Sequence, residues 1–397
     1  MDPTDPSHAR RRSGPLAGVR VVEFGGIGPG PFCGMMLSDA GADVIRIDRP
    51  GRSSNGWPGG PADAYDVTGR GRRSLALDLK QPAAVETCLS LMERADAAFE
   101  GFRPGVMERL GLGPDVALAR NPRLVYGRMT GWGQYGPYAQ SAGHDINYVA
   151  LSGALHAIGT EERPVPPLNL VGDYGGGAMF LAFGLLAAII SARETGKGQV
   201  IDAAMTDGAA TLMAPIYGLK AAGLWRDGRR SNFLDGGAPF YDVYRCRDGK
   251  WLSLGPLEPQ FFGAMQQALG IAAVADYMTP ETWPRLREEI AAAVARETRD
   301  HWEATLAGKD VCAAAVLSLD EAPSHAHNRA RDAFVERGGV VQPAPAPRFS
   351  QTPGRIQGAP PGAGEHNDEV LRDWGFTDGE IAGLRERKVL VDPVAPD

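Results

Sequence analysis

The sequence has few cysteines and no excess of basic residues, and each shortage excludes a class of protein. Only four cysteines occur in 397 residues, with no Cys-x-x-Cys pair, which argues against a disulfide framework or a zinc knuckle. We therefore expect a reducing, cytoplasmic location. The formal net charge of −7 argues against a nucleic-acid or membrane partner. An anionic ligand would need a local group of arginines.

Long hydrophobic runs are also lacking. The longest apolar run, residues 178–192, is shorter than the roughly 20 residues that span a bilayer, so a buried helix is the better interpretation. The polar stretch 1–13 contains three consecutive arginines but no apolar signal core follows it. We expect this stretch to be a disordered leader.

Several catalytic and binding motifs are absent or incomplete. There is no Gly-x-Ser-x-Gly elbow and no phosphate-binding Walker loop. His325 and His327 have no further ligand at a familiar spacing, so we expect no metal site. The glycine-rich loop 25–30 lies where a dinucleotide fingerprint would lie, but Pro31 or Cys33 occupies the position of the third glycine. A nicotinamide or flavin site is thus disfavoured.

The first half of the chain alternates short buried strands with helices. This alternation is typical of an α/β fold with a large parallel sheet. The expected strands are residues 19–24, 43–48, 74–79, 97–101, 124–129 and 199–203, and the expected helices are 31–40, 82–95, 178–192 and 204–224.

The second half indicates a smaller α+β domain. Asp248-Gly249 predicts a hairpin between residues 241–247 and 250–254, because this dipeptide tolerates positive φ angles. Helical segments are expected within 260–316, then a proline-rich linker, 342–364, and two closing helices. We expect a leader at 1–13, a large domain from 14–225 and 340–397, and a small domain at 226–339 with its connectors.

Three residues stand out as candidates for chemistry, and each has a structural alternative. His144 follows a turn-rich run near a loop-to-helix junction, where a satisfied structural histidine is also common. Asp173 precedes three glycines and an apolar helix, where an aspartate often serves as an N-cap. Glu258 stands just before a helix, where a surface cap is the ordinary explanation.

Strings along nearly the whole chain from Gly14 resemble the family III CoA-transferase superfamily, and specifically its α-methylacyl-CoA racemase branch. The strings that carry the resemblance are residues 14–23, 28–32, 43–50, 102–106, 109–113, 131–134, 143–148 and 364–371. The resemblance implies a large α/β domain built from both chain ends, a smaller middle domain, and an interlocked homodimer. The site then forms between the large domain of one subunit and the small domain of the other.

The resemblance also implies roles for individual residues. In the transferases the aspartate that matches Asp173 is a covalent nucleophile. His144 and Glu258 resemble the histidine and the glutamate of the racemase branch. In that branch the resemblance implies that His144 and Asp173 are opposed bases and that Glu258 supports the imidazole. The Asp145 amide is expected to stabilise an enolate oxygen. Arginines expected near coenzyme A are Arg49, Arg103 and Arg109.

The function implied is racemisation of the α-carbon of 2-methylacyl-CoA thioesters by two-base proton transfer, with coenzyme A as part of the substrate and no other cofactor. The alternative is a family III CoA-transferase that moves CoA between carboxylic acids through Asp173. A third possibility is a non-catalytic protein that binds CoA thioesters. The common fold does not separate these three functions, so the residues of the site have to distinguish them.

Overall fold

The computed structural model describes residues 12–51 and 63–391. The chain divides into two compact units. The first contains residues 12–51, 63–152, 168–212 and 330–391, and the second contains residues 153–167 and 213–329. Residues 1–11 of the expected leader lie outside the described residues. The domain boundaries that we expect near residues 225 and 340 stay a prediction.

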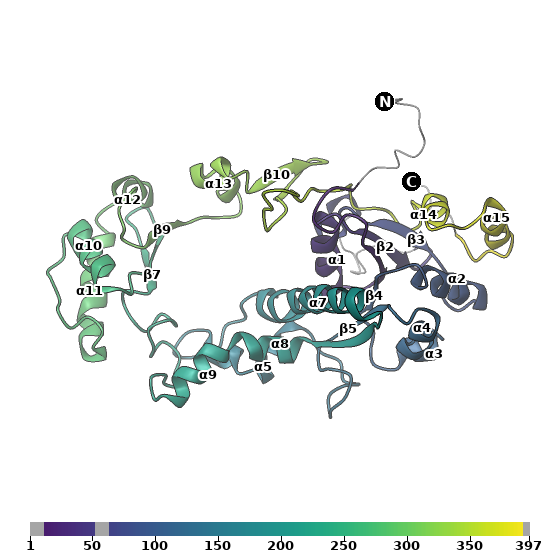
Figure 1. Cartoon of the computed structure of the whole chain (residues 1–397). Coiled ribbons are helices and arrows are strands. Elements are labelled where there is room, and N and C mark those ends of the chain that lie inside the picture. Colours follow the sequence, from purple (N-terminus) through teal and green to yellow (C-terminus); the bar gives the residue numbers. More distant parts are fainter. Residues whose placement is uncertain (1–11, 52–62, 392–397) are drawn as a thin grey trace. The chain divides into compact units, whose positions relative to one another are not determined.

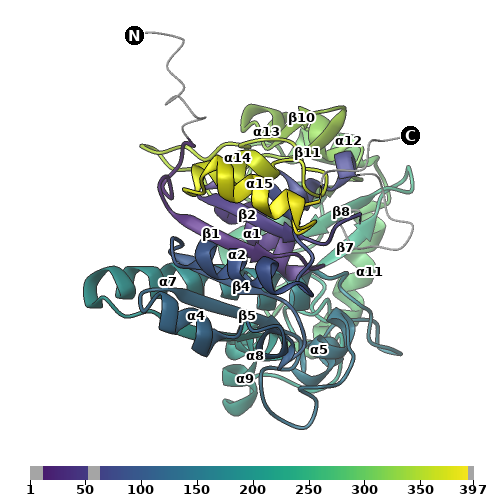
Figure 2. The same ribbon diagram turned by 90° about the vertical axis from the view of Figure 1, so that its right-hand side faces the viewer.

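A six-stranded sheet forms the centre of the first unit (Figures 1 and 2). Every neighbouring pair is parallel, in the order β3-β2-β1-β4-β5-β6. The strands are β1 (Arg20–Phe24), β2 (Asp43–Asp48), β3 (Arg73–Ala76), β4 (Ala97–Glu100), β5 (Val125–Thr130) and β6 (Gln199–Ala204). The prediction of an α/β fold with a large parallel sheet is confirmed.

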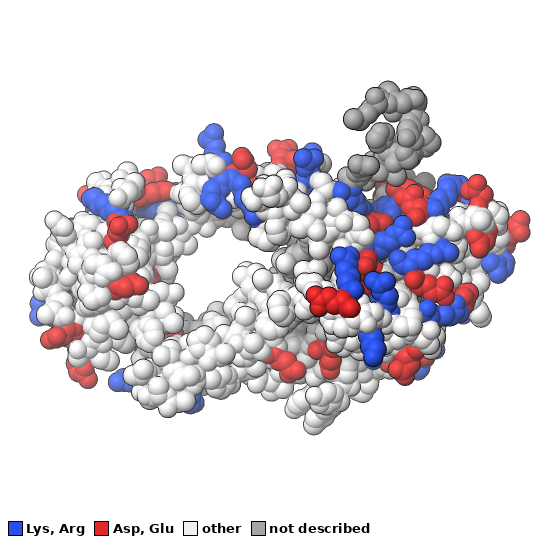
Figure 3. All heavy atoms as spheres, in the orientation of Figure 1, with Lys and Arg blue, Asp and Glu red and all other residues white. Residues whose placement is uncertain are grey.

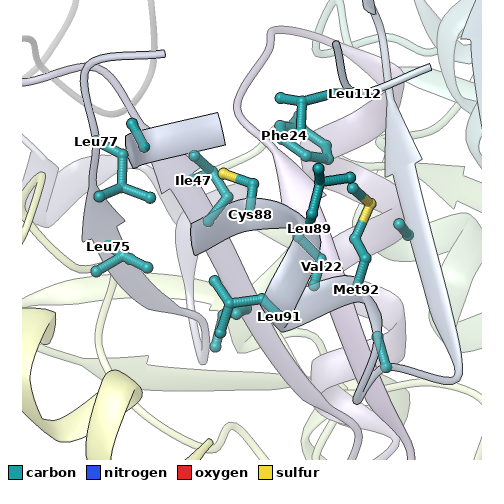
Figure 4. Close-up of a cluster of buried hydrophobic side chains, with 14 of the residues drawn as sticks. Val22, Phe24, Ile47, Leu75, Leu77, Cys88, Leu89, Leu91, Met92 and Leu112 are labelled. Atoms are coloured by element: carbon teal, nitrogen blue, oxygen red, sulfur yellow. The ribbon is translucent and has the colours of Figure 1, made fainter. Parts of the chain in front are cut away.

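One face of this sheet is covered by helices from both ends of the chain. Figure 4 shows Cys88, Leu89, Leu91 and Met92 of one helix directed at the side chains of the first three strands. The C-terminal helices add Trp374, which is almost fully buried in the same cluster. The helices of this face are α2 (Pro82–Met92), α4 (Pro114–Arg120), α14 (Asn367–Asp373) and α15 (Asp378–Glu386).

The opposite face packs against α1 (Pro29–Asp39) and α7 (Met179–Thr195). A π-helical segment, η4 (Leu170–Ala178), leads directly into α7, so the continuous helix spans 26 residues. By length and composition this helix could cross a membrane, but half of its most apolar window is buried inside the protein. Leu181 and Leu185 lie in the second core cluster with Val125, whereas Phe183 and Ile190 of the same helix are exposed.

The remaining elements of the first unit are short. They are α3 (Val106–Arg109), α5 (Asp145–Leu151), α8 (Met205–Leu212), the 3-10 turns η2 (Asp63–Tyr65) and η3 (Val67–Gly69), and the antiparallel hairpin β10 (Phe334–Arg337) and β11 (Val340–Pro343). The single helix that we expect over 204–224 is interrupted after Leu212. Pro215 lies in the first turn of the next helix, where a proline removes a backbone donor and ends the preceding pattern.

The second unit contains a three-stranded antiparallel sheet, in the order β7-β8-β9, packed against helices. The expected hairpin is present, with Gly249 at φ 81°. Residues 313–316, expected to be helical, instead form β9, because they pair with β8. The elements are β7 (Asp242–Arg245), β8 (Trp251–Leu254), β9 (Ala313–Val316), α6 (Ala154–Ala157), α9 (Ala214–Ala221), α10 (Pro259–Leu269), α11 (Trp283–Val294), α12 (Arg299–Leu306), α13 (Ala326–Ala330), η5 (Pro280–Thr282) and η6 (Ala322–Ser324).

Candidate functional site

The strand order places a ligand-binding edge at the carboxyl ends of β1 and β4. From β1 the chain proceeds to β2 and β3 on one side, and β4 and β5 lie on the other. In open parallel sheets, ligands bind outside the carboxyl ends of the strands where the order reverses in this way. The loops that follow β1, β2, β4 and β5 all leave the sheet at this edge.

The loop after β1 brings the backbone close to Asp173. Gly28 is the N-cap of α1, with φ 71°, and Pro29 begins the helix. A Cβ atom on Gly28 would lie 3.1 Å from Oδ2 of Asp173. Glycine is therefore needed here for two reasons, the left-handed φ and the closeness of the carboxylate.

Asp173 lies within the π-helical segment η4, not at the N-cap of an ordinary helix. The amide of Asn169 donates a hydrogen bond of 3.2 Å to its Oδ2 atom. Burial raises the pKa of Asp173, and the neighbouring carboxylate of Asp145 raises it further. The Asn169 hydrogen bond and His144 act in the lowering direction. The carboxyl group thus has a net raised pKa and lies within electrostatic range of His144.

His144 and Asp145 form the start of α5. The exposed His144 is the N-cap, and its amide donates to Oδ1 of Asn147 at 3.1 Å. The buried Asp145 side chain accepts a hydrogen bond from the backbone amide of Asp173 at 2.7 Å. The residue that directly follows His144 is therefore bonded to Asp173, which fixes the starts of these two segments relative to each other.

The close approach of α5 and η4 depends on Gly172. A Cβ atom at this position would lie 2.5 Å from Oδ2 of Asp145. The other carboxylate oxygen of Asp145 is buried and has no hydrogen-bond partner among the described residues. Within the same described ranges, the Asp145 backbone amide donates no hydrogen bond either. Both groups therefore lack a hydrogen-bond partner in this part of the chain.

Two aromatic side chains hold the loop that precedes His144. Tyr148 donates a hydrogen bond to the carbonyl oxygen of Gly143, and Trp132 packs edge-on against its ring with centroids 4.7 Å apart. Burial raises the pKa of Tyr148, Asp173 raises it further, and Arg103 lowers it. The Tyr148 hydroxyl is therefore within electrostatic range of both Arg103 and Asp173.

The three arginines expected near coenzyme A are all exposed. Arg49 directly follows β2 and Arg103 follows β4, so both leave the sheet at its carboxyl edge, and Arg109 ends α3. None of the three forms an ion pair within residues 12–51 and 63–391. By contrast, Arg128 of β5 is bound by Glu100 at 3.0 Å and Glu108 at 2.7 Å. That pairing ties α3 to the sheet.

Charge of both signs is interspersed over the first unit, as the face drawn in Figure 3 shows around α2, α14 and α15. An anion is consequently not drawn to a broad basic field but has to be held by individual arginines. Among the described residues no group of three or more His, Cys, Asp or Glu side chains could hold a metal ion.

Glu258 belongs to the second unit, where it is the exposed N-cap of α10. The carbonyl oxygen of Glu258 accepts a hydrogen bond of 2.9 Å from the amide of Phe262.

Of the residues that the sequence predicts, the structure brings together His144, Asp145 and Asp173 in the first unit, with Arg103 nearby. It places Glu258 at a helix start, as the sequence predicts.

Sequence reasoning missed three contributors to this site. They are the Asp145 carboxylate, the Asn169 amide and the Tyr148 hydroxyl. The only signal for the first is the small Gly172 before Asp173, which permits close contact. The contact itself joins residues 28 positions apart and is not visible in any local pattern.

Comparison with known proteins identifies the family of this chain. A model of CoA-transferase family III matches residues 16–367. The crystal structure of a CAIB/BAIF family protein from Brucella suis superposes with a TM-score of 0.79 at 25% identity, covering 91% of this chain and all of the other. Rv3272 from M. tuberculosis superposes with a TM-score of 0.74 at 27% identity, covering 90% and 99%. This chain belongs to CoA-transferase family III.

Curated relatives of this chain include racemases and CoA-transferases. The alpha-methylacyl-CoA racemases of Mus musculus and Homo sapiens are each 42% identical to this chain, covering 94% of it and 97% of the relative. Succinyl-CoA–D-citramalate CoA-transferase of Chloroflexus aurantiacus is 31% identical over 96% of this chain and the whole relative. The similarity is thus considerably stronger to the racemases.

Proposed function

We propose that this protein is an isomerase that racemises the α-carbon of 2-methylacyl-CoA thioesters. The observation that carries the proposal is the linked pair of His144 and Asp173, joined through Asp145 at the carboxyl edge of the sheet. The 42% identity to two racemases over nearly the full length supports it.

Inversion next to a thioester requires removal of a proton from one face of the carbon and return of a proton to the other. Two groups that can each give and take a proton are the simplest means. A carboxyl group with a raised pKa suits this work, because a general base is most effective when its pKa lies nearer the pH at which the enzyme works. His144 and Asp173 are the two bases in our proposal.

The planar enolate between the two proton transfers carries negative charge on the thioester oxygen. The Asp145 backbone amide, which has no acceptor among the described residues, stabilises that oxygen in the proposed mechanism. Glu258 orients the His144 imidazole and stabilises its protonated form, as a carboxylate does beside a catalytic histidine.

Coenzyme A is held by arginines in the proposed complex. Arg49, Arg103 and Arg109 are exposed and without ion pairs in the described ranges, so their guanidinium groups are free to bind phosphate. The protein is further proposed to act as an interlocked homodimer in which Glu258 comes from the partner chain.

The second candidate is CoA transfer with Asp173 as a covalent nucleophile. The 31% identity to a CoA-transferase and the membership of the family favour it. The identity to the two racemases is higher, at 42%, and favours the first candidate.

Two assays separate the candidates. The purified protein is incubated in heavy water with each enantiomer of a panel of branched fatty, sterol-side-chain and aromatic 2-methylacyl-CoA thioesters, and deuterium at the α-carbon is measured by NMR. Racemisation predicts exchange and loss of optical purity. Transfer of CoA to an added carboxylic acid, without α-exchange, would instead identify a transferase. The absence of both reactions would indicate a protein that only binds CoA thioesters.

A further inference from the structure

Tyr277 of the second unit contacts the chain on both sides of Glu258. Its hydroxyl donates a hydrogen bond of 2.7 Å to the carbonyl oxygen of Leu257, the residue directly before Glu258. Its ring stacks on Phe262, one turn into α10, with centroids 3.9 Å apart and an interplanar angle of 11°. One side chain therefore fixes both the entry to this helix and its first turn.

Tyr277 is itself held in place by the core. It is 6% exposed, and the ring of Phe240 packs edge-on against it with centroids 5.1 Å apart. The indole of Trp283 donates a hydrogen bond of 3.0 Å to the backbone oxygen of Tyr277. The core therefore holds Tyr277 in a fixed position, and Tyr277 in turn restrains the segment that contains Glu258.

The other side of the same segment is also fixed. The amide of Gly255 donates a hydrogen bond of 2.8 Å to the carbonyl oxygen of Cys312. Cys312 has φ 47°, a left-handed conformation that is rare for a residue other than glycine and that persists only when its surroundings impose it. Both Tyr277 and Cys312 lie within electrostatic range of the Glu258 carboxylate.

Packing alone does not account for the tyrosine. A phenylalanine would stack on Phe262 equally well, because the rings differ only in the hydroxyl group. The hydrogen bond of that hydroxyl goes to the backbone next to Glu258, which is exposed and has no side-chain hydrogen bond within the described part of the chain.

We propose that Tyr277 is a positioning residue for the racemase reaction, which fixes the direction of Glu258 through its hydrogen bond to Leu257 and its stack on Phe262. The inference rests on the proposed role of Glu258 beside His144. Tyr277 touches no reacting atom, and it acts by limiting the orientations of one carboxylate.

The test compares Tyr277→Phe with a matched control, Tyr244→Phe. Tyr244 is also buried in this core and donates its hydroxyl to a backbone carbonyl, that of Pro239, but it is not within electrostatic range of Glu258. Tyr277→Phe is expected to lower kcat on the order of 10-fold, a modest loss for a misdirected group, with KM unchanged. Tyr244→Phe is expected to keep the kcat of the unaltered protein.

A double-mutant cycle with Glu258→Gln shows whether Tyr277 acts through Glu258. Once Glu258 is neutralised, Tyr277→Phe should cause no further loss of kcat. Equal losses from Tyr277→Phe with and without Glu258→Gln would overturn the proposal, as would a kcat for Tyr277→Phe equal to that of the control. Thermal unfolding of every variant identifies a loss that is due to unfolding alone.

Hydrogen exchange provides a measurement that does not depend on activity. Faster amide exchange at residues 255–262 in Tyr277→Phe, but not in Tyr244→Phe, is expected, because the lost hydrogen bond frees this segment. Unchanged exchange there would overturn the proposal. Failure of the proposed function is distinguishable, since it would leave the unaltered protein without α-exchange or leave Glu258→Gln fully active.

Discussion

At the scale of single residues, the two proposed bases differ in their surroundings. His144 is an exposed N-cap, whereas Asp173 is partly buried and bordered by Asp145 and Asn169. If they face opposite sides of the substrate carbon, each removes the α-proton of only one enantiomer.

His144→Ala should therefore lose α-exchange on one enantiomer while Asp173 still exchanges the other. Asp173→Asn should show the reverse preference. Removal of a positioned base typically costs about 10²- to 10⁴-fold in rate, so NMR in heavy water measures the asymmetry directly. Equal loss of both exchanges in each variant, with folding and CoA binding intact, would favour a covalent role for Asp173.

The pKa of Asp173 gives a second prediction, in which two neighbours act with opposite sign. Asp145→Asn keeps an oxygen that accepts the Asp173 amide but removes a negative charge that raises the pKa of Asp173. That pKa should fall, so the carboxylate base persists to lower pH. The acidic limb of kcat/KM for the enantiomer that Asp173 deprotonates is expected to move to lower pH.

Asn169→Ala is the opposing control. It removes a hydrogen bond that lowers the pKa of Asp173, so the same acidic limb should move to higher pH. Profiles of the two variants that coincide with that of the unaltered protein would show that Asp173 does not limit the reaction at low pH.

At the scale of elements, the loop between β1 and α1 is predicted to need glycine at position 28. Gly28→Ala places a Cβ atom 3.1 Å from Asp173 and forces alanine to a left-handed φ, a strain of about 1–2 kcal/mol. Displacement of the carboxylate is expected to lower kcat on the order of 10²-fold. Steady-state kinetics and thermal unfolding measure the two effects separately.

Gly18→Ala is the matched control for that strain. Gly18 has φ 87°, but nothing lies within 4 Å of its Cβ position. It should lose similar stability and keep its kcat. Equal activities of the two variants would mean that contact with Asp173 is not what requires Gly28.

The loop after β4 is predicted to bind the phosphates of coenzyme A through Arg103. Arg103→Ala should raise the Kd for CoA about 10-fold, which is the ordinary cost of losing one charge-assisted hydrogen bond. Calorimetric titration measures this change. Binding should also weaken with salt, because charges are screened beyond about 10 Å at 0.1 M. Affinity that stays constant from low to high salt would refute the role of the arginines.

Arg123→Ala is a suitable control, since Arg123 is exposed and precedes β5 at the opposite edge of the sheet. Arg12 is a poorer control, because it is bound to its surroundings although it lies in the stretch that we expect to be a disordered leader. Its guanidinium lies 3.3 Å from Asp43 and donates to the carbonyl oxygens of Ala42 and Gly71. An equal effect of Arg123→Ala and Arg103→Ala would indicate nonspecific attraction.

At the scale of the whole molecule, the proposed interlocked homodimer makes a prediction about mixed subunits. If Glu258 is supplied across subunits, His144→Ala and Glu258→Ala proteins should regain racemase activity when they are refolded together, because one intact site forms in each heterodimer. Differently tagged subunits and purification through both tags verify the heterodimer. Verified heterodimers without activity would mean that each chain builds its own site.

The sequence by itself determined the parts whose information is local. Alternating buried strands and helices, such as 43–48 and 82–95, specify a parallel α/β sheet, because hydrophobic period and turn residues act over a few positions. The hairpin at Asp248-Gly249 is equally local, since one dipeptide supplies its turn.

Tertiary structure alone decided the rest, because it depends on contacts between distant positions. Residues 313–316 are a strand since β8 offers an edge for pairing, and no local propensity reveals that partner. Gly28, Asp145 and Asp173 meet only when the loops after β1 and β5 converge at the carboxyl edge of the sheet. The pKa of Asp173 follows from that convergence, because burial and neighbouring charge are properties of the folded chain.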